Sequence, residues 1–377
     1  QGRQADENDR RRPHAQRLQV AADPRLAHLV ETHGAQDVWE TIRRQGESTS
    51  LGRRAQGVDP EALEAATTRS GAGFLVPGDE LWPDTLSDLG MCQLGDQGGQ
   101  PLGLWVAGNP ELLRMPRAVA VVGARAATGY GLHVAGELAA DLSASGWLVI
   151  SGLAFGIDSA AHRGALGVGG LTLAVMATGV DKTYPAGHHG LRNQIQASGA
   201  VITELAPGTH PLRASFLGRN RLIAALGSGA VVVEAGARSG ARNTISWAAE
   251  LGRVTMAVPG PVTSMESVGC HRLLRGGAVC VTDAEDALEL VAPLGSVDPE
   301  ASRAAAPGNA GSGLLDGLTG DAAVVLDALP ARATATVEAL ARSAGRSESE
   351  VVSALGLLEL SGRVERDGMR WRRRAVR

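Results

Sequence analysis

The side chains best suited to binding a charged ligand lie in and just before the segment SFLGRNRLIAAL, Ser215–Leu226. Phe216 is accompanied there by three arginines, Arg213, Arg219 and Arg221. An aromatic ring can stack a nucleic-acid base while neighbouring guanidinium groups neutralise phosphates. None of these residue types is a nucleophile or a metal ligand, so the segment indicates binding of a polyanion and not bond-breaking chemistry. The alternative is that Phe216 is a core residue and the arginines are solvated.

Two glycine-containing turns carry arginines of the same kind. GARAATGYG, residues 123–131, offers Gly123 and Arg125 ahead of a predicted helix, and GARSGARNT, residues 236–244, offers Arg238, Ser239, Gly240 and Thr244. Backbone N–H groups at such turns bind phosphate-sized anions, and small residues allow a close approach. The glycine spacing does not match a dinucleotide fingerprint, and the chain has no Gly-Lys pair for a Walker loop. A purely structural turn at Gly123 remains the alternative.

A Ser/His/Asp triad is a further hypothesis, raised by Ser151, Asp158 and His162 in SGLAFGIDSAAHRGAL. Asp158 and His162 fall on one predicted helix, and an aspartate near a helix N-terminus is explained by capping and by the helix dipole. We therefore expect no catalytic residue. His14, His188 and His189 lack the cysteine or carboxylate partners of a metal site, so we expect no metal and no cofactor.

Short apolar runs rich in β-branched residues predict the scaffold that positions these groups. Continuous apolar strands are buried on both faces, which is typical of a parallel sheet covered by helices. Strands alternating with helical segments predict an α/β doubly wound, Rossmann-like fold, whose ligands bind outside the carboxyl ends of the strands. The runs span residues 118–124, 147–152, 171–179, 200–205, 230–235, 254–260 and 278–282.

The flanking segments predict further domains. We expect a disordered tail at 1–17 and a small helical module at 18–70, with a helix on each side of Gly34, a linker at 47–57 and a helix at 60–68. The Rossmann-like domain spans 73–293, and a Gly/Ala/Pro/Ser-rich linker spans 294–320. Three helical runs and a hairpin at Asp367-Gly368 give residues 321–377 a winged-helix layout.

The distribution of charge along the chain is more informative than its net charge. The net charge is −4, and Lys182 is the only lysine, so the arginine excess partly reflects codon usage. Residues 207–253 nevertheless hold six arginines against two glutamates, and residues 361–377 hold seven arginines against two acidic residues. Three cysteines without CxxC spacing, no signal peptide and no long apolar run favour a soluble cytoplasmic protein with no membrane partner.

The ordered set of motifs between Phe74 and Leu290 resembles the DNA-processing protein A (DprA/Smf) family. The motifs are FLVPGDELWPDTL, GARAATGYG, SGLAFGIDSAAHRGAL, TGVDKTYPAGHHGL, SFLGRNRLIAAL, VVEAGARSGARNT and AVPGPVTSMESVGCHRLLRGGA. The resemblance implies an extended Rossmann domain, a small helical (SAM/HhH-like) N-terminal module and a C-terminal winged helix. It also implies a non-catalytic homodimer that binds single-stranded DNA and loads the RecA recombinase during transformation or homologous recombination.

The resemblance also assigns residues. It implies phosphate contact by Arg125, and a shared pocket lined by Arg213, Phe216, Arg219 and Asn220. It places the dimer contact around Cys270, His271, Leu274 and Val279. The chain departs from the family pattern at Ala124, where the family has serine, at Phe155, where it has arginine, and at Leu217, where it has proline. At position 155 the chain loses a phosphate contact, although a ring there can stack a base.

Two other functions stay open on the sequence. A phosphoribohydrolase of the lysine-decarboxylase-like type is a nucleotide-processing Rossmann enzyme with a catalytic glutamate beside a Gly-Gly phosphate turn. Glu234 precedes such a turn here, but AGARSGA lacks the adjacent glycines. A transcription factor acting through the winged helix alone is the third hypothesis, and a preference for duplex DNA would favour it.

Overall fold

The computed structural model describes residues 22–237, 239–292, 320–330, 334–360, 363–368 and 370–373. The chain divides into two compact units near residue 297. The tail expected at 1–17 and nearly all of the linker expected at 294–320 lie outside the described residues. None of the described helices is long and apolar enough to cross a membrane.

The helical N-terminal part consists of α2 (Pro24–His33), α3 (Ala35–Gln45), α4 (Ser50–Gln56) and α5 (Pro60–Arg69). Helices α2 and α5 begin alike: Asp23 and Asp59 each accept two backbone N–H groups, and a proline opens each first turn. The predicted helices on either side of Gly34 are confirmed. Their apolar stripes pack into one cluster that includes Leu26, Val38, Trp39 and Ile42.

The linker expected at 47–57 is wrong, because this segment contains α4. Thr49 caps the helix by accepting the N–H of Gly52 through its hydroxyl at 3.0 Å. Gly52 also packs so closely on Gly46 that a Cβ there would lie 2.0 Å from the Gly46 carbonyl oxygen. The polar composition of this segment favoured a linker, but the segment contains a capping residue and a close contact between two glycines.

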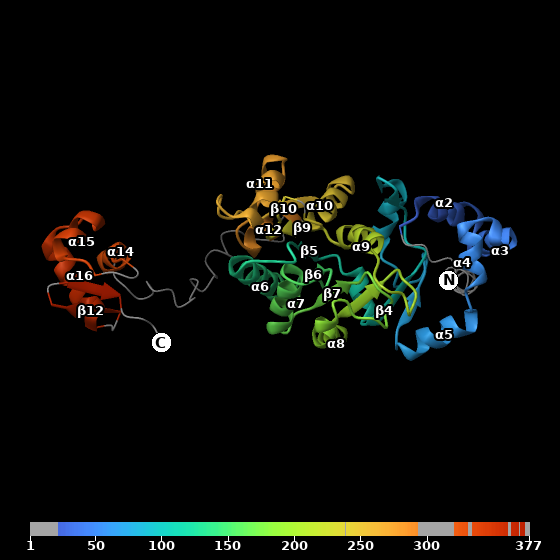
Figure 1. The fold of residues 1–377 in the computed structure, drawn as a ribbon, viewed down its shortest axis with the longest axis horizontal. Coiled ribbons are helices and arrows are strands. Elements are labelled where there is room, and N and C mark those ends of the chain that lie inside the picture. The colour runs from blue at the N-terminus through green and yellow to red at the C-terminus, as the bar shows by residue number, and fades with distance from the viewer. Residues whose placement is uncertain are drawn as a thin grey trace. The chain divides into compact units, whose positions relative to one another are not determined.

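Nine strands form one sheet in the order β1-β4-β8-β7-β6-β5-β9-β10-β11. Neighbouring strands from β8 to β11 run parallel, and each predicted apolar run contains one of them, so the predicted α/β fold is confirmed (Figure 1). The bounds are β1 Gly73–Leu75, β4 Leu104–Gly108, β5 Ala118–Val122, β6 Leu148–Ser151, β7 Thr172–Val175, β8 Ala200–Thr203, β9 Gly229–Val232, β10 Val254–Ala257 and β11 Val279–Cys280.

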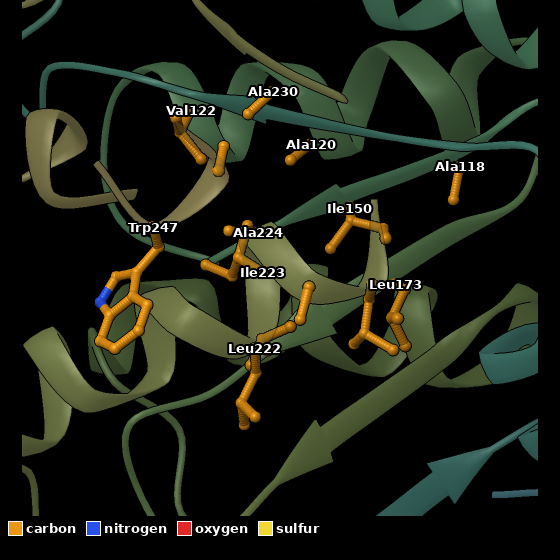
Figure 2. Close-up of a cluster of buried hydrophobic side chains, with 14 of the residues drawn as sticks. Ala118, Ala120, Val122, Ile150, Leu173, Leu222, Ile223, Ala224, Ala230 and Trp247 are labelled. Atoms are coloured by element: carbon orange, nitrogen blue, oxygen red, sulfur yellow. The ribbon is translucent and has the colours of Figure 1, made fainter. Parts of the chain in front are cut away.

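Helices cover both faces of this sheet (Figure 1). Ala118, Ala120 and Val122 of β5 pack toward α9 and α10, whereas Val119 and Val121 pack toward α6, α7 and α12. Figure 2 shows the cluster beneath α9 and α10. The helices are α6 Gly129–Ala144, α7 Ile157–Gly167, α8 His189–Ser198, α9 Arg213–Leu226, α10 Ala241–Glu250, α11 Val268–Arg275 and α12 Ala284–Val291.

Two strands at one edge were not predicted from the sequence. Strand β4 pairs antiparallel with β8, and β1 pairs antiparallel with β4. Phe74 of β1 stacks on Trp105 of β4 with ring centroids 4.5 Å apart. These strands cover the backbone groups that β8 would otherwise expose at the edge of the parallel sheet.

The order in which the strands are added to the sheet changes direction between β5 and β9. Strands β6, β7 and β8 extend the sheet on one side of β5, and β9, β10 and β11 extend it on the other. A reversal of this kind leaves a crevice outside the carboxyl ends of the two central strands. The predicted ligand-binding turns at Gly123 and Gly236 follow these two strands.

The second unit has the predicted winged-helix layout. It consists of α14 (Gly320–Ala328), α15 (Val337–Ala344), α16 (Glu348–Leu360) and the hairpin of β12 (Val364–Asp367) and β13 (Arg370–Arg373). Val325, Leu340 and Leu355 belong to its own apolar core. Gly368 turns the hairpin with φ at 62°, a conformation that favours glycine.

Candidate nucleic-acid interface

A cavity of about 800 Å³ lies at the carboxyl ends of β5 and β9. Every described residue of the predicted DNA-binding set lines it: Gly123, Arg125, Arg213, Phe216, Arg219, Asn220, Ser239, Gly240 and Thr244. Arg238, the remaining member of that set, lies outside the described residues. Segments more than 100 positions apart in the sequence therefore meet at one crevice.

Phe216 is the aromatic member of this cavity and is half-buried. The guanidinium carbon of Arg125 lies 4.8 Å from its ring centroid, and that of Arg219 lies 5.7 Å away. The ring of Tyr184 lies 5.3 Å from it, measured between centroids. A ring held among cations in this way can stack a base whose phosphates are neutralised alongside.

Two helices point their N-termini at the same cavity. Arg213 is exposed and opens α9, and Gly240 directly precedes α10. At α10, the Ser239 hydroxyl accepts the Ala241 N–H at 3.3 Å, and the next two N–H groups bond the Ser239 and Gly240 carbonyl oxygens. No described side chain caps α9, so its first N–H groups remain available to a ligand. These N–H groups and the helix dipoles favour a negatively charged ligand and add to the charge of Arg125 and Arg213.

The glycines of the two turns have different roles. A Cβ on Gly123 would lie 2.5 Å from Ile157 and 2.8 Å from the Glu234 carbonyl oxygen, so the packing of the protein itself requires glycine there. Gly240 has no atom within 4 Å of such a Cβ. The structural alternative for Gly123 thus has its own support, and the open space at Gly240 suits the approach of a ligand.

Arg219 lines the cavity, and its guanidinium group is already bound to other groups of the protein. Its Nη1 donates to the carbonyl oxygens of Gly152 and Val175, the latter at 2.8 Å, and its Nη2 lies 3.9 Å from Asp158. Burial lowers the pKa of Arg219 to about 10, and Asp158 opposes this shift. Arg219 therefore holds the turn after β6 and the end of β7 in place in addition to lining the cavity.

Arg221 turns away from the cavity and lies fully buried. Its Nη1 and Nη2 donate to the two carboxylate oxygens of Glu204 at 2.8 and 2.7 Å. Its Nε donates to the Gly99 carbonyl oxygen at 3.1 Å. The interpretation of Arg221 as one of three ligand-binding arginines is wrong, because this side chain is part of the internal structure.

The side chains of the triad hypothesis bind elsewhere. The Ser151 hydroxyl donates to the Val121 carbonyl oxygen at 2.7 Å, and Asp158 accepts the N–H of Ala154. His162 Nδ1 lies 2.7 Å from the Thr172 hydroxyl, which itself donates to a carbonyl oxygen. Nδ1 must therefore carry the proton, and Nε2 is buried without a hydrogen-bond partner.

His162 makes stability depend on pH. Burial lowers the pKa of His162 to about 3, whereas an unfolded histidine titrates near pH 6.5. Only the unfolded chain then binds this proton in between, so stability falls as the pH drops below about 6.5. We expect a loss of roughly 2 kcal/mol in the free energy of unfolding between pH 6.5 and 5 from this group.

Urea unfolding at several pH values measures the effect of His162. His162→Gln should show a shallower fall than the wild type over this range. Thr172→Val keeps the imidazole and removes its partner, so its fall should stay as steep as that of the wild type. Equal slopes in the wild type and His162→Gln would contradict the assignment.

Glu234, the glutamate of the phosphoribohydrolase hypothesis, is 2% exposed. Its carboxylate accepts the Thr128 N–H at 2.9 Å and the Thr128 hydroxyl at 2.6 Å, at the start of α6. A Cβ on Gly131 would lie 2.1 Å from the same carboxylate. Glu234 therefore stabilises the N-terminus of α6.

The residues of the predicted dimer contact differ in exposure. Cys270 is fully buried, with its Sγ 3.5 Å from the Val233 carbonyl oxygen, so it packs within the chain. His271 Nε2 lies 2.9 Å from the Gly260 carbonyl oxygen. Val279 is 41% exposed on the edge strand β11, and Leu274 is half-buried on α11. Val279 is thus the exposed member of the set, and His271 and Leu274 are half-buried.

The cavity also contains residues that the sequence did not single out. Glu266 and Asn243 line it, and Asn243 accepts a hydrogen bond from Asn220 at 3.0 Å. The signal for Glu266 was its place in the turn region after β10, which opens at the same edge as the turns after β5 and β9. Asn243 lies within the second glycine turn, GARSGARNT.

Two family models match the chain. The model described as DNA recombination-mediator protein A matches residues 73–292, and the DprA winged helix domain matches residues 305–368. The chain belongs to the DNA-processing protein A family. A putative DNA processing protein DprA of Mycobacterium tuberculosis is 44% identical over 366 residues, which are 94% of this chain and 92% of that protein.

Solved DprA structures have the same fold. DprA of Streptococcus pneumoniae matches with a TM-score of 0.62 and 32% identity, over 73% of this chain and 95% of that one. DprA of Helicobacter pylori, described for its single-stranded DNA binding mode, matches with a TM-score of 0.50 and 25% identity, over 58% of this chain and 96% of that one. The family predicted from the motifs is therefore confirmed.

Proposed function

We propose that this DprA-family protein binds single-stranded DNA in the cavity at β5 and β9 and acts without a catalytic step. The observation that carries the proposal is the cavity itself, where Phe216 lies against Arg125 and Arg219 and the N-termini of α9 and α10 converge. A stacking ring among cations suits a strand whose bases are unpaired. The single-stranded DNA binding named for the Helicobacter pylori relative supports the same assignment.

The finer proposals follow from the family. We propose that the protein acts as a cytoplasmic homodimer, through Leu274 and Val279, and loads RecA onto the bound strand in transformation or recombination. We further propose that residues 73–293 form the DNA-binding domain, that residues 18–70 form a helical module and that residues 321–377 form a separate winged-helix domain. Arg238 remains a proposed phosphate contact.

The enzyme hypothesis receives less support from the site. A catalytic glutamate must reach the substrate, whereas Glu234 is buried and its carboxylate oxygens bind Thr128. Incubation of the protein with nucleoside monophosphates should therefore release no free base. Release of base that is lost in Glu234→Gln would favour the phosphoribohydrolase instead.

The winged helix alone is poorly suited to carry the function. Helix α16, at the position of a recognition helix, exposes Glu348, Glu350 and Glu359 and contains no arginine or lysine. Acidic side chains at this position repel a phosphate backbone. This arrangement disfavours a transcription factor that reads duplex DNA through α16.

Binding of single and double strands, with and without residues 321–377, tests the proposal. We expect the full chain to prefer a single strand over a duplex of the same sequence. The truncated chain should retain that single-strand affinity within about threefold, since the cavity lies wholly in the first unit. A preference for duplex that disappears on truncation would contradict the proposal and favour the winged helix as the binding site.

A further inference from the structure

Exposed aromatic side chains gather beside the cavity and almost nowhere else in the first unit. Phe155, after β6, is 52% exposed, and Tyr184, after β7, is 47% exposed. Tyr130, at the start of α6, is the other exposed aromatic residue among those described in the unit, and its hydroxyl donates to the Pro259 carbonyl oxygen at 2.6 Å. The remainder are buried: Trp39, Phe74, Trp82, Trp105, Trp147 and Trp247. The chain contains only three phenylalanines and two tyrosines, so this placement is selective.

The loop between β7 and α8 connects these exposed rings to the cavity. Tyr184 in this loop lies 5.3 Å from Phe216, measured between ring centroids. His188, at the other end of the loop, packs edge-on against Phe155 with centroids 4.6 Å apart. His188 is itself fixed, because it is buried and its Nδ1 lies 3.0 Å from the Leu153 carbonyl oxygen. Both exposed rings are therefore positioned by contacts, and the Tyr184 ring lies next to Phe216.

Nearby cations in the loop do not explain why these rings are exposed. Lys182 is the nearest cation in the loop sequence, and Asp181 stands beside it with its carboxylate bound to the Gly208 N–H at 2.7 Å. An exposed ring next to a base-binding pocket offers a flat apolar face that any base can cover. A surface of this kind contributes affinity through the bases and adds little dependence on salt.

We infer that Phe155 and Tyr184 form a second base-stacking surface, which binds nucleotides of the strand beyond the one held at Phe216. The inference rests on the proposed single-strand binding and extends it to a longer footprint. It also gives a role to the exposed ring of Phe155. The strand would leave the cavity across the carboxyl ends of β6 and β7.

Two oligonucleotides distinguish this surface from the cavity, one of about 4 thymidines and one of about 12. We expect Phe155→Ala and Tyr184→Ala to weaken binding of the longer strand by about 5- to 150-fold, the range of base stacking on a protein ring. Binding of the shorter strand should change less than twofold. The matched control is Val168→Ala, which removes an equally exposed apolar side chain just after α7, away from the carboxyl edge.

A longer strand with abasic sites outside a central four-nucleotide stretch gives the deciding readout and does not depend on the folding of any variant. The wild type should bind it as weakly as the double variant Phe155→Ala, Tyr184→Ala binds the intact strand, and the double variant should not distinguish the two. Equal wild-type affinity for the intact and abasic strands would overturn the second surface but leave the cavity proposal standing. No wild-type binding to any of the strands would instead defeat the proposed function itself.

Discussion

Replacing Arg221 with alanine lowers the free energy of unfolding by about 3–5 kcal/mol, the cost of leaving a buried carboxylate without its partner. Arg221 is fully buried and bonds Glu204 through two nitrogen–oxygen contacts. It also holds the carbonyl oxygens of Gly99 and Gly218. A loss of this size is a large part of the 5–15 kcal/mol that stabilises a typical domain. Urea unfolding of the wild type and the variant measures it.

A partly exposed pair in the same unit provides the control for Arg221. The carboxylate of Asp88 lies 2.5 Å from the Arg253 guanidinium, and the Asp88 side chain is 48% exposed. Asp88→Asn should therefore cost only about 0–1 kcal/mol. Arg221→Met combined with Glu204→Gln should recover part of the loss, because no unpaired charge remains. A stable Arg221→Ala that binds DNA weakly would return Arg221 to the binding site and contradict its structural role.

The parts of the fold that depend on local patterns were predictable. Unbroken apolar runs such as residues 118–124 indicated strands buried on both faces, and β5 is buried throughout. Because parallel strands end at the same edge of a sheet, the sequence also predicted that Arg125, Phe216 and Ser239 lie in one region. The antiparallel strand β4 was missed, because nothing in its residues specifies that it pairs beside β8.

The positions and partners of the individual arginine side chains were not predictable from the sequence. Arg213, Arg219 and Arg221 look equivalent in sequence, yet the first is exposed, the second is buried against carbonyl oxygens and the third is paired with Glu204. Helix α9 is buried on every side from Gly218 onward, so its direction relative to the sheet decides where each arginine points. That direction is set by tertiary packing, which the helical spacing of the residues does not contain.

Phe216→Ala should weaken single-strand binding by about 5- to 150-fold, because a stacked base contributes roughly 1–3 kcal/mol. The salt dependence should remain that of the wild type, since no cation is removed. Phe216→Tyr keeps a ring and should retain most of the affinity. If Phe216→Ala binds as tightly as the wild type, or if its salt slope falls, the ring does not act by stacking.

The measurement that tests single-strand binding in this cavity most directly is the affinity of Arg213→Ala for a single strand over a series of salt concentrations. Arg213 is exposed at the first turn of α9, so its loss should remove a phosphate contact without disturbing the fold. We predict weaker binding and a log–log salt slope reduced by about 0.7, the value of one phosphate contact on a single strand. Arg163→Ala, an exposed arginine on α7 that does not line the cavity, should match the wild type. An affinity and a slope for Arg213→Ala equal to those of the wild type would contradict the assignment of this cavity to DNA.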